Sequence, residues 1–344
     1  FDSAALVSFL GARAIPGVES VDGSAWRRTA ELAGVAGIVE AEVDAARSSI
    51  TVRLVGLPPG AALDAARRAG RLFDTDADPV AIAAHLGRDP LLAPLVELRP
   101  GLRVPGAWDP FETAVRTVLG QQVSVKAART LAARLVSRFG RPLPPGVARG
   151  SLTHLFPRPD DLAEADVASI GLPSRRGETI RAFAREVAAG RLDLGPAASL
   201  EEAERRLAAI PGVGPWTAQA IALRSLGEPD AFPGGDLGVR KALAVRGVAP
   251  TTAAAEARAA AWRPWRAYAL VHLWTDLASR EDSRRPRSRP PRSTRPREGS
   301  GSPPAKARSS PPSSPNACRT ASRGSRPASA RSSSGTRPTP PAPL

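Results

Sequence analysis

The feature that most constrains this 344-residue sequence is a pair of helical segments joined by a turn of five residues. Apolar residues recur at helical spacing over residues 199–210, and Pro211 ends that segment. A second helix is predicted from Thr217 to Leu226. The connection, Pro211-Gly-Val-Gly-Pro215, contains two glycines, which permit positive φ and allow a partner's backbone to approach closely.

A tight Gly-x-Gly turn that leads into a helix directs free N–H groups outward, and such groups bind phosphate without reading base sequence. This is the geometry of a helix-hairpin-helix, although an isolated turn of this kind is also a common connector between helices. Asp236 follows twelve residues after Arg224, directly behind a Gly-Gly pair and at the start of another apolar-periodic segment. Taken alone, Asp236 would be a helix N-cap. The turn and Asp236 together favour a functional site over a simple connection between helices.

Composition excludes several classes of protein. Cys318 is the only cysteine, and the three histidines, His85, His154 and His272, share no ligand spacing, so we expect no metal site and no cofactor. The sequence contains neither a secretory signal nor an apolar run of about eighteen residues, so a cytoplasmic protein that does not enter a membrane is expected. It begins at Phe1 and contains no methionine, so we expect the true start to lie upstream.

The net charge of +15 is unevenly distributed. Residues 283–344 contain fourteen Arg and Lys residues against one acid, which leaves residues 1–282 nearly neutral. That segment also lacks Val, Ile, Phe, Trp and Tyr, so it cannot bury enough apolar surface to offset its ordering entropy. We predict a disordered basic tail over residues 282–344. It could bind DNA non-specifically, or it could be a spacer or the product of a shifted reading frame.

The rest of the chain divides into two predicted domains. Residues 1–80 contain a helix at 4–14, two strands within 36–56 and a helix at 61–72, which indicates a small α+β domain. Residues 81–281 are predicted to form a helical domain, all-α from residue 107 onward. Its first two predicted helices cover residues 109–119 and 125–139. Six more are predicted at 159–168, 175–189, 199–210, 216–226, 236–245 and 252–279.

Five motifs in order resemble the bacterial 3-methyladenine DNA glycosylase II (AlkA) family of the helix-hairpin-helix DNA glycosylase superfamily. They are the hairpin with Asp236, Phe9-Leu-Gly-Ala-Arg-Ala14, Pro100-Gly-Leu-Arg-Val-Pro105, the segment from Phe111 to Val125 that contains Gly-Gln-Gln-Val-Ser, and the segment Trp262 to Trp274. The resemblance covers residues 1 to about 281. It implies the same order of a small sheet-plus-helix domain and a helical glycosylase domain.

The resemblance also implies roles for individual residues. Asp236 would be catalytic, and the base pocket would be lined by Trp216, Trp274 and Phe9, although each aromatic residue could instead be a core residue. Gly212, Gly214 and Thr217 would hold a DNA phosphate, and Gln122 would be the wedge that enters the duplex gap. The sequence departs from the family's pattern at Ala220 and Thr275, where tyrosines are found, and at Gln122, where an apolar side chain is usual. These departures affect which bases the protein would accept and how efficiently it would flip them, and they leave the class of reaction unchanged.

The implied activity is DNA repair by base excision. The protein would flip alkylated bases of the 3-methyladenine and 7-methylguanine type out of double-stranded DNA and hydrolyse the N-glycosidic bond, leaving an abasic site. Its partner would be double-stranded DNA, with no obligate protein partner and a monomeric state. Trp216 stands where lyases of the endonuclease III type have a lysine, so a monofunctional enzyme is expected. The alternatives are a non-catalytic helix-hairpin-helix DNA-binding module and the C-terminal part of a fused alkylation-response regulator.

Overall fold

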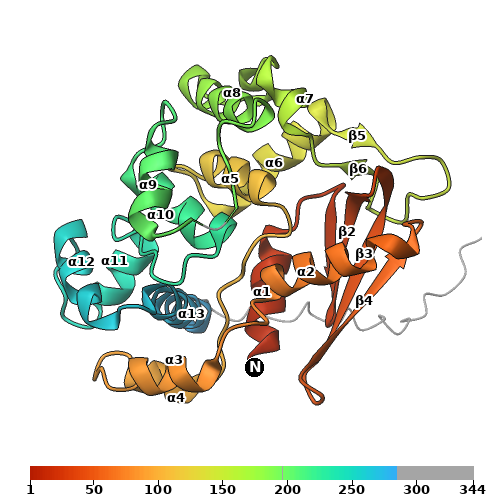
Figure 1. Cartoon of the computed structure of the whole chain (residues 1–344). Helices are drawn as coiled ribbons and strands as arrows, with labels where there is room; N and C mark the ends of the chain where they lie inside the picture. The colour runs from red at the N-terminus through yellow and green to blue at the C-terminus, as the bar shows by residue number, and fades with distance from the viewer. Residues whose placement is uncertain (196, 285–344) are drawn as a thin grey trace, which may run out of the picture. The chain divides into compact units, whose positions relative to one another are not determined.

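The computed structural model describes residues 1–195 and 197–284 (Figure 1). Its N-terminal part contains a four-stranded antiparallel sheet in which each strand pairs with its sequence neighbour, in the order β1-β2-β3-β4. The strands are β1 (Glu19–Asp22), β2 (Ala25–Leu32), β3 (Val35–Asp44) and β4 (Ser49–Val55). The two strands predicted within residues 36–56 are β3 and β4. Strands β1 and β2 were not predicted, because the buried Arg28 and Thr29 of β2 hide its apolar alternation.

Helices α1 (Ser3–Arg13) and α2 (Ala62–Phe73) pack on one face of this sheet (Figure 1). Alternate residues of β2 and β3, among them Trp26 and Val39, form a core with both helices and with Trp108. The neighbouring Ile38 points to the opposite face, where it packs with Leu143, Leu152 and Leu155 beside the short paired strands β5 (Arg141–Pro142) and β6 (His154–Leu155). This alternation is the period of two expected of a strand that is buried on both faces.

The remaining elements are mostly helical and share one large core. They are α3 (Pro79–Leu86), α4 (Ala93–Leu98), α5 (Pro110–Leu119), α6 (Val125–Phe139), α7 (Pro159–Ala163), α8 (Ser174–Ala188), α9 (Leu200–Ala208), α10 (Pro215–Ile221), α11 (Leu237–Ala244), α12 (Thr252–Ala259) and α13 (Arg266–Arg284). Asp109 caps α5 by accepting a hydrogen bond from the Glu112 N–H at 2.9 Å, as its Asp-Pro start predicts. The predicted fold class, a sheet-plus-helix part followed by a mostly helical part, is confirmed.

Four details of the predicted helical part were wrong. The helix predicted over residues 252–279 is interrupted at Arg263-Pro264, because proline cannot continue a helix, and α12 and α13 lie on either side. The helix predicted over residues 159–168 ends at Ala163. The strands β5 and β6 break the all-α pattern, and a π-helical turn (Ala222–Leu226) follows α10 in place of a continuous helix.

The division into domains at residues 80 and 281 stays a prediction. Ile15 and Val18 from the N-terminal part belong to the same core as the helices, so the two parts are packed together over a common interior. Helix α13 extends to Arg284, three residues into the predicted tail, and the rest of that tail lies outside the described residues. Within the described residues, no helix is both long and apolar enough to cross a membrane.

Candidate active site

A cavity of about 270 Å³ brings together four of the residues singled out in the sequence: Asp236, Trp216, Trp274 and Phe9. They come from α1, the start of α10, the N-cap of α11 and the middle of α13, which are far apart in sequence. Ala220 lines the same cavity, so the absence of a tyrosine there leaves open space. Thr275 lies outside the cavity lining, and its hydroxyl donates to the Val271 carbonyl oxygen at 2.7 Å.

The carboxylate of Asp236 is held by two donors on one oxygen. Its Oδ1 accepts the Val239 N–H at 2.9 Å, as an N-cap of α11 does, and the Trp274 indole N–H at 2.9 Å. Among the described residues, Oδ2 has no hydrogen-bond partner. The cap and catalytic interpretations of Asp236 are therefore compatible, because one oxygen fixes the orientation and the other is available at the cavity.

Phe9 is not a free stacking surface. The Arg13 guanidinium carbon lies 3.6 Å from the centroid of the Phe9 ring, and that of Arg224 lies 4.7 Å from it. Burial and the nearby charge of Arg116 lower the pKa of Arg13 to about 10, although Asp236 acts in the opposite direction. Burial, with the charges of Arg13 and Arg116, lowers the pKa of Arg224 to about 9. Both guanidinium groups stay protonated at neutral pH in a partly desolvated site.

Behind these arginines lies a buried chain of alternating charges. Arg28 pairs with Glu112 at 2.6 Å, Arg116 pairs with Glu112 at 3.0 Å, and Arg116 pairs with Glu19 at 2.8 Å. Arg116 also donates to the Arg13 carbonyl oxygen at 2.6 Å, which ties this network to the end of α1. The network joins the sheet to α5, and its two positive and two negative charges balance.

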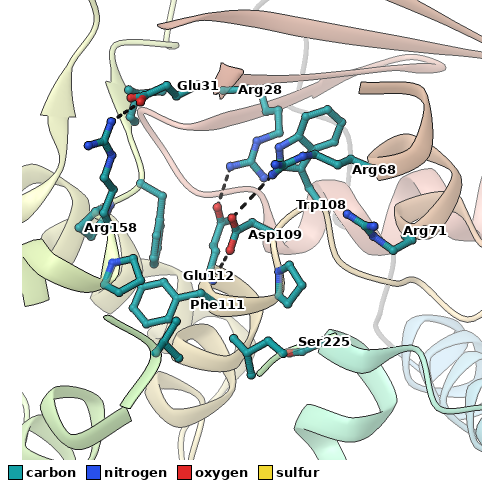
Figure 2. Close-up of a pocket in the computed structure, with 18 of the residues that line it drawn as sticks. Arg28, Glu31, Arg68, Arg71, Trp108, Asp109, Phe111, Glu112, Arg158 and Ser225 are labelled. Carbon is teal, nitrogen blue, oxygen red and sulfur yellow. Dashed lines mark hydrogen bonds and ion pairs between the residues drawn. The ribbon is translucent and has the colours of Figure 1, made fainter. Parts of the chain in front are cut away.

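A second cavity of about 610 Å³ lies on the other side of this network and shares Arg28, Trp108 and Glu112 with the first (Figure 2). Figure 2 shows its charged side chains directed toward one another: Arg28 pairs with Glu112, and Arg158 pairs with Glu31. Arg68 lies 3.8 Å from Asp109. Arg28, Arg68 and Arg158 are therefore paired within the protein, whereas the smaller cavity holds Asp236, whose Oδ2 has no hydrogen-bond partner among the described residues.

The two hairpin glycines differ in their conformation. Gly212 has a φ of 85°, as expected, and a Cβ there would lie 2.0 Å from the Thr179 hydroxyl oxygen. Gly214 has extended backbone, with φ −87° and ψ 176°, and a Cβ there would meet no described atom within 4 Å. Gly214 is the N-cap of α10 without a side-chain cap, and Pro215 at the first helical position has no N–H, so the N–H groups of Trp216 and Thr217 are open to an outside partner. The positive φ that the sequence permits at both glycines is therefore adopted only by Gly212.

Thr217 and Gln122 are connected through a residue that the sequence analysis did not single out. The Thr217 side chain is only 3% exposed, and its hydroxyl oxygen accepts a hydrogen bond from the Gln121 amide at 2.9 Å. Gln122 is exposed at the tip of the loop between α5 and α6, with a φ of 56°. The Gln121–Thr217 contact thus fixes this loop against the hairpin helix.

Arg13, Arg224 and Gln121 are the residues of the site that sequence reasoning missed. Phe9 and Arg13 are four residues apart in one helix, so they lie on the same face, and this spacing is the signal that could have found Arg13. Within residues 1–195 and 197–284, no cluster of three His, Cys, Asp or Glu side chains could hold a metal ion.

Comparison with known proteins identifies two families along the chain. Residues 1–109 match the AlkA N-terminal domain, and residues 115–267 match the HhH-GPD superfamily of base excision DNA repair proteins. A protein of Mycobacterium tuberculosis named "Probable bifunctional transcriptional activator/DNA repair enzyme AlkA" is 45% identical over 268 residues, which are 78% of this chain and 53% of that protein. The chain thus spans about half the length of this relative.

A shorter relative is matched over nearly its whole length. The Escherichia coli protein named "DNA-3-methyladenine glycosylase 2" is 35% identical over 281 residues, which are 80% of this chain and 93% of that protein. Among solved structures, a 3-methyladenine DNA glycosylase from Archaeoglobus fulgidus has a TM-score of 0.69 at 24% identity, covering 80% of this chain and 95% of that one. An 8-oxoguanine glycosylase/lyase of Clostridium acetobutylicum, crystallised with double-stranded DNA, has a TM-score of 0.60 at 20% identity, covering 78% and 89%. These two structures share the fold.

Proposed function

Because this chain belongs to the AlkA family of base excision DNA repair proteins, we propose that it is a monofunctional DNA glycosylase that removes alkylated purines from double-stranded DNA. The observation that carries the proposal is the Asp236 carboxylate, fixed through one oxygen by Trp274 and Val239 at the edge of a cavity lined by two tryptophans. A protein that only binds DNA phosphates would need neither the oriented carboxylate nor an aromatic cavity.

Hydrolysis of an N-glycosidic bond passes through an oxocarbenium-like state at C1′ of the sugar. Asp236 stabilises that positive charge electrostatically and orients the attacking water, a role that suits a carboxylate held in place before the reaction. The flipped base enters the cavity beside Trp216 and Trp274, whose faces stack on it. Purines alkylated at N3 or N7 are cationic and leave without being protonated, so one carboxylate is sufficient.

The surrounding elements position the DNA. The open N–H groups at the start of α10, next to Gly214, bind a backbone phosphate without reading sequence. Gln122, exposed at the tip of its loop, fills the gap that the flipped base leaves. The absence of a lysine at Trp216 removes the amine of the lyase reaction, so borohydride should trap no covalent adduct between the protein and DNA. A trapped adduct would contradict the monofunctional assignment.

The test of the proposal is release of free base from alkylated duplex DNA, followed by chromatography, with strand integrity checked before heat or alkali. Asp236→Asn should retain the fold, because asparagine is an equally good N-cap, but should lower the single-turnover rate about a hundredfold. Asp78→Asn is the matched control, since Asp78 caps the exposed start of α3 and lies outside the cavity. Equal rates for Asp236→Asn and Asp78→Asn would reduce Asp236 to a helix cap.

A further inference from the structure

The larger cavity, of about 610 Å³, is not used by the proposed glycosylase function, because neither Asp236, Trp216 nor Trp274 lines it. Its walls come from α2, β2, α5 and the end of α8, together with the π-helical turn that follows α10. The apolar part of the wall includes Trp108, Phe111, Phe156, Val187 and Leu226. A cavity of this size with an apolar wall and a few polar groups is typical of a small-molecule site.

Arg71 is the arginine of this cavity that has no partner among the described residues. The other four arginines in the lining, Arg28, Arg68, Arg141 and Arg158, are paired with acids. Arg68 and Arg71 are three residues apart in α2, so they lie on the same face of that helix. Figure 2 shows the Arg71 guanidinium directed into the cavity on the side of Arg68 and Trp108. A guanidinium group without a carboxylate is available to an anionic group of a ligand.

Two further polar side chains of the lining lack partners in the part of the chain that the structure describes. The Asp193 carboxylate follows α8 and pairs with no cation; its Oδ1 accepts only the Gly195 N–H, at 2.8 Å. Ser225, in the π-helical turn, is 5% exposed, and its hydroxyl makes no hydrogen bond. A buried hydroxyl in this state is costly, and π-helical turns are frequent at functional sites. The cavity thus offers a cation, an acceptor and a hydroxyl from three different elements.

We propose that this cavity binds a nucleoside monophosphate. Arg71, with Arg68 beside it, binds the phosphate, whose charge and oxygens suit arginine. The ribose hydroxyls donate to the Asp193 carboxylate, which can only accept. The base lies against the apolar wall, where the Ser225 hydroxyl can donate to or accept from its polar edge.

The binding of such a ligand leaves the rest of the cavity wall intact. Arg28 and Glu112, which line both cavities, keep their ion pair, because the ligand needs none of the paired arginines except Arg68. Arg68 keeps its bond to the Asp64 carboxylate at 3.0 Å and lies 3.8 Å from Asp109. The site is therefore separate from the proposed glycosylase chemistry and does not depend on it.

The test measures binding of AMP, GMP, CMP and UMP to the full chain by isothermal titration calorimetry. Inorganic phosphate and adenosine are titrated separately, since each carries only part of the ligand's chemistry. At least one nucleotide should bind about tenfold or more tightly than either inorganic phosphate or adenosine, because it alone contacts both Arg71 and the apolar wall.

Two variants locate the bound nucleotide. Arg71→Gln should weaken nucleotide binding about tenfold or more, because a charge-assisted hydrogen bond is lost. Arg67→Gln is the matched control, since Arg67 is an exposed arginine of the same helix that lies outside the cavity lining. Asp193→Ala should weaken nucleotide binding several-fold and leave binding of inorganic phosphate unchanged. Arg71 and Asp193 are both exposed, so these variants should retain the fold.

The outcomes separate this inference from the proposed function. No binding of any nucleotide, or equal affinities in Arg71→Gln and Arg67→Gln, would overturn the assignment of this cavity. Inorganic phosphate that binds as tightly as the nucleotides would show a site for anions only, and it would overturn the nucleotide assignment. Release of alkylated bases from duplex DNA is measured separately, and its failure would overturn the glycosylase proposal while leaving the nucleotide site standing.

Discussion

At the scale of single residues, the two hairpin glycines give a prediction that separates folding from binding. Gly212→Ala should destabilise the protein by about 2 kcal/mol or more, because alanine at positive φ is strained and its Cβ would meet the Thr179 hydroxyl. Gly214→Ala should cost less than about 1 kcal/mol, because its backbone is extended and its surroundings are open. Urea unfolding of both variants measures the difference.

Gly214→Ala also tests the proposed contact between the hairpin and a DNA phosphate. Gly214→Ala places a methyl group where a DNA backbone would approach α10, so its affinity for undamaged duplexes should fall by a similar factor for every sequence. Fluorescence anisotropy with several unrelated duplexes measures this change. A loss confined to particular sequences, or an unchanged affinity, would contradict the role of the hairpin as a phosphate clamp.

Residue identities in the site were predictable to different degrees. Asp236, Trp216, Trp274 and Phe9 were singled out from motifs, and the structure places all four at one cavity, although their roles stay predictions. The sequence could not indicate that Arg224 would reach the ring of Phe9, because that contact depends on how α1 packs against the turn after α10. Contacts across such long stretches of sequence leave no local pattern.

At the scale of elements, the loop between α5 and α6 and the hairpin helix α10 behave as one unit through Gln121 and Thr217. Gln121→Ala removes this contact and leaves the Thr217 hydroxyl buried without its donor, which should cost about 1 kcal/mol of stability. We also expect base excision to slow several-fold, because the loop that carries Gln122 is no longer held against the hairpin. Single-turnover rates and urea unfolding give the two readouts.

Gln122→Ala is the comparison for that variant, since it removes the exposed side chain at the loop tip but keeps the Gln121–Thr217 contact. It should slow excision without destabilising the fold. If Gln121→Ala loses stability but keeps the original rate, the contact is structural and does not position the loop.

The elements that were predicted correctly are those with a local signal at both ends. Helix α5 has an Asp-Pro start, and β3 and β4 alternate around a polar turn. Strand β2 escaped prediction because Arg28 is buried in it, which is possible only with Glu112 of α5 as its partner. The break in the predicted helix over 252–279 could have been placed at Pro264 from the sequence alone.

At the scale of the whole molecule, the buried network of Arg28, Glu112, Arg116 and Glu19 connects the sheet to the helical part. Burial by itself would raise the pKa of Glu112, but the charges of Arg28 and Arg116 lower it. Arginines likewise lower the pKa of Glu31 and of Asp276 against the effect of burial. Such groups favour the folded state only while they are ionised.

The lowered pKa values of these carboxyl groups determine how the free energy of unfolding changes with pH. A carboxyl group with a lower pKa in the folded state contributes stability that is fully present above its unfolded pKa, near 4.3 for Glu, and is lost as the pH falls through the folded pKa. Asp74 has the opposite effect, because burial raises its pKa. Carboxyl groups with a lowered pKa outnumber those with a raised pKa. The free energy of unfolding should therefore decrease steadily below about pH 4.5.

Glu112→Gln isolates the contribution of the central carboxylate to that decrease. Glutamine is close in shape but leaves Arg28 and Arg116 facing a neutral group, so the variant should lose about 3 kcal/mol or more at neutral pH. Because it no longer has this carboxyl group to protonate, its stability should fall less steeply than that of the unchanged protein as the pH decreases. Urea unfolding at several values between pH 3 and pH 7 measures both slopes. Parallel curves would show that Glu112 is not the group whose protonation weakens the connection between the sheet and the helices.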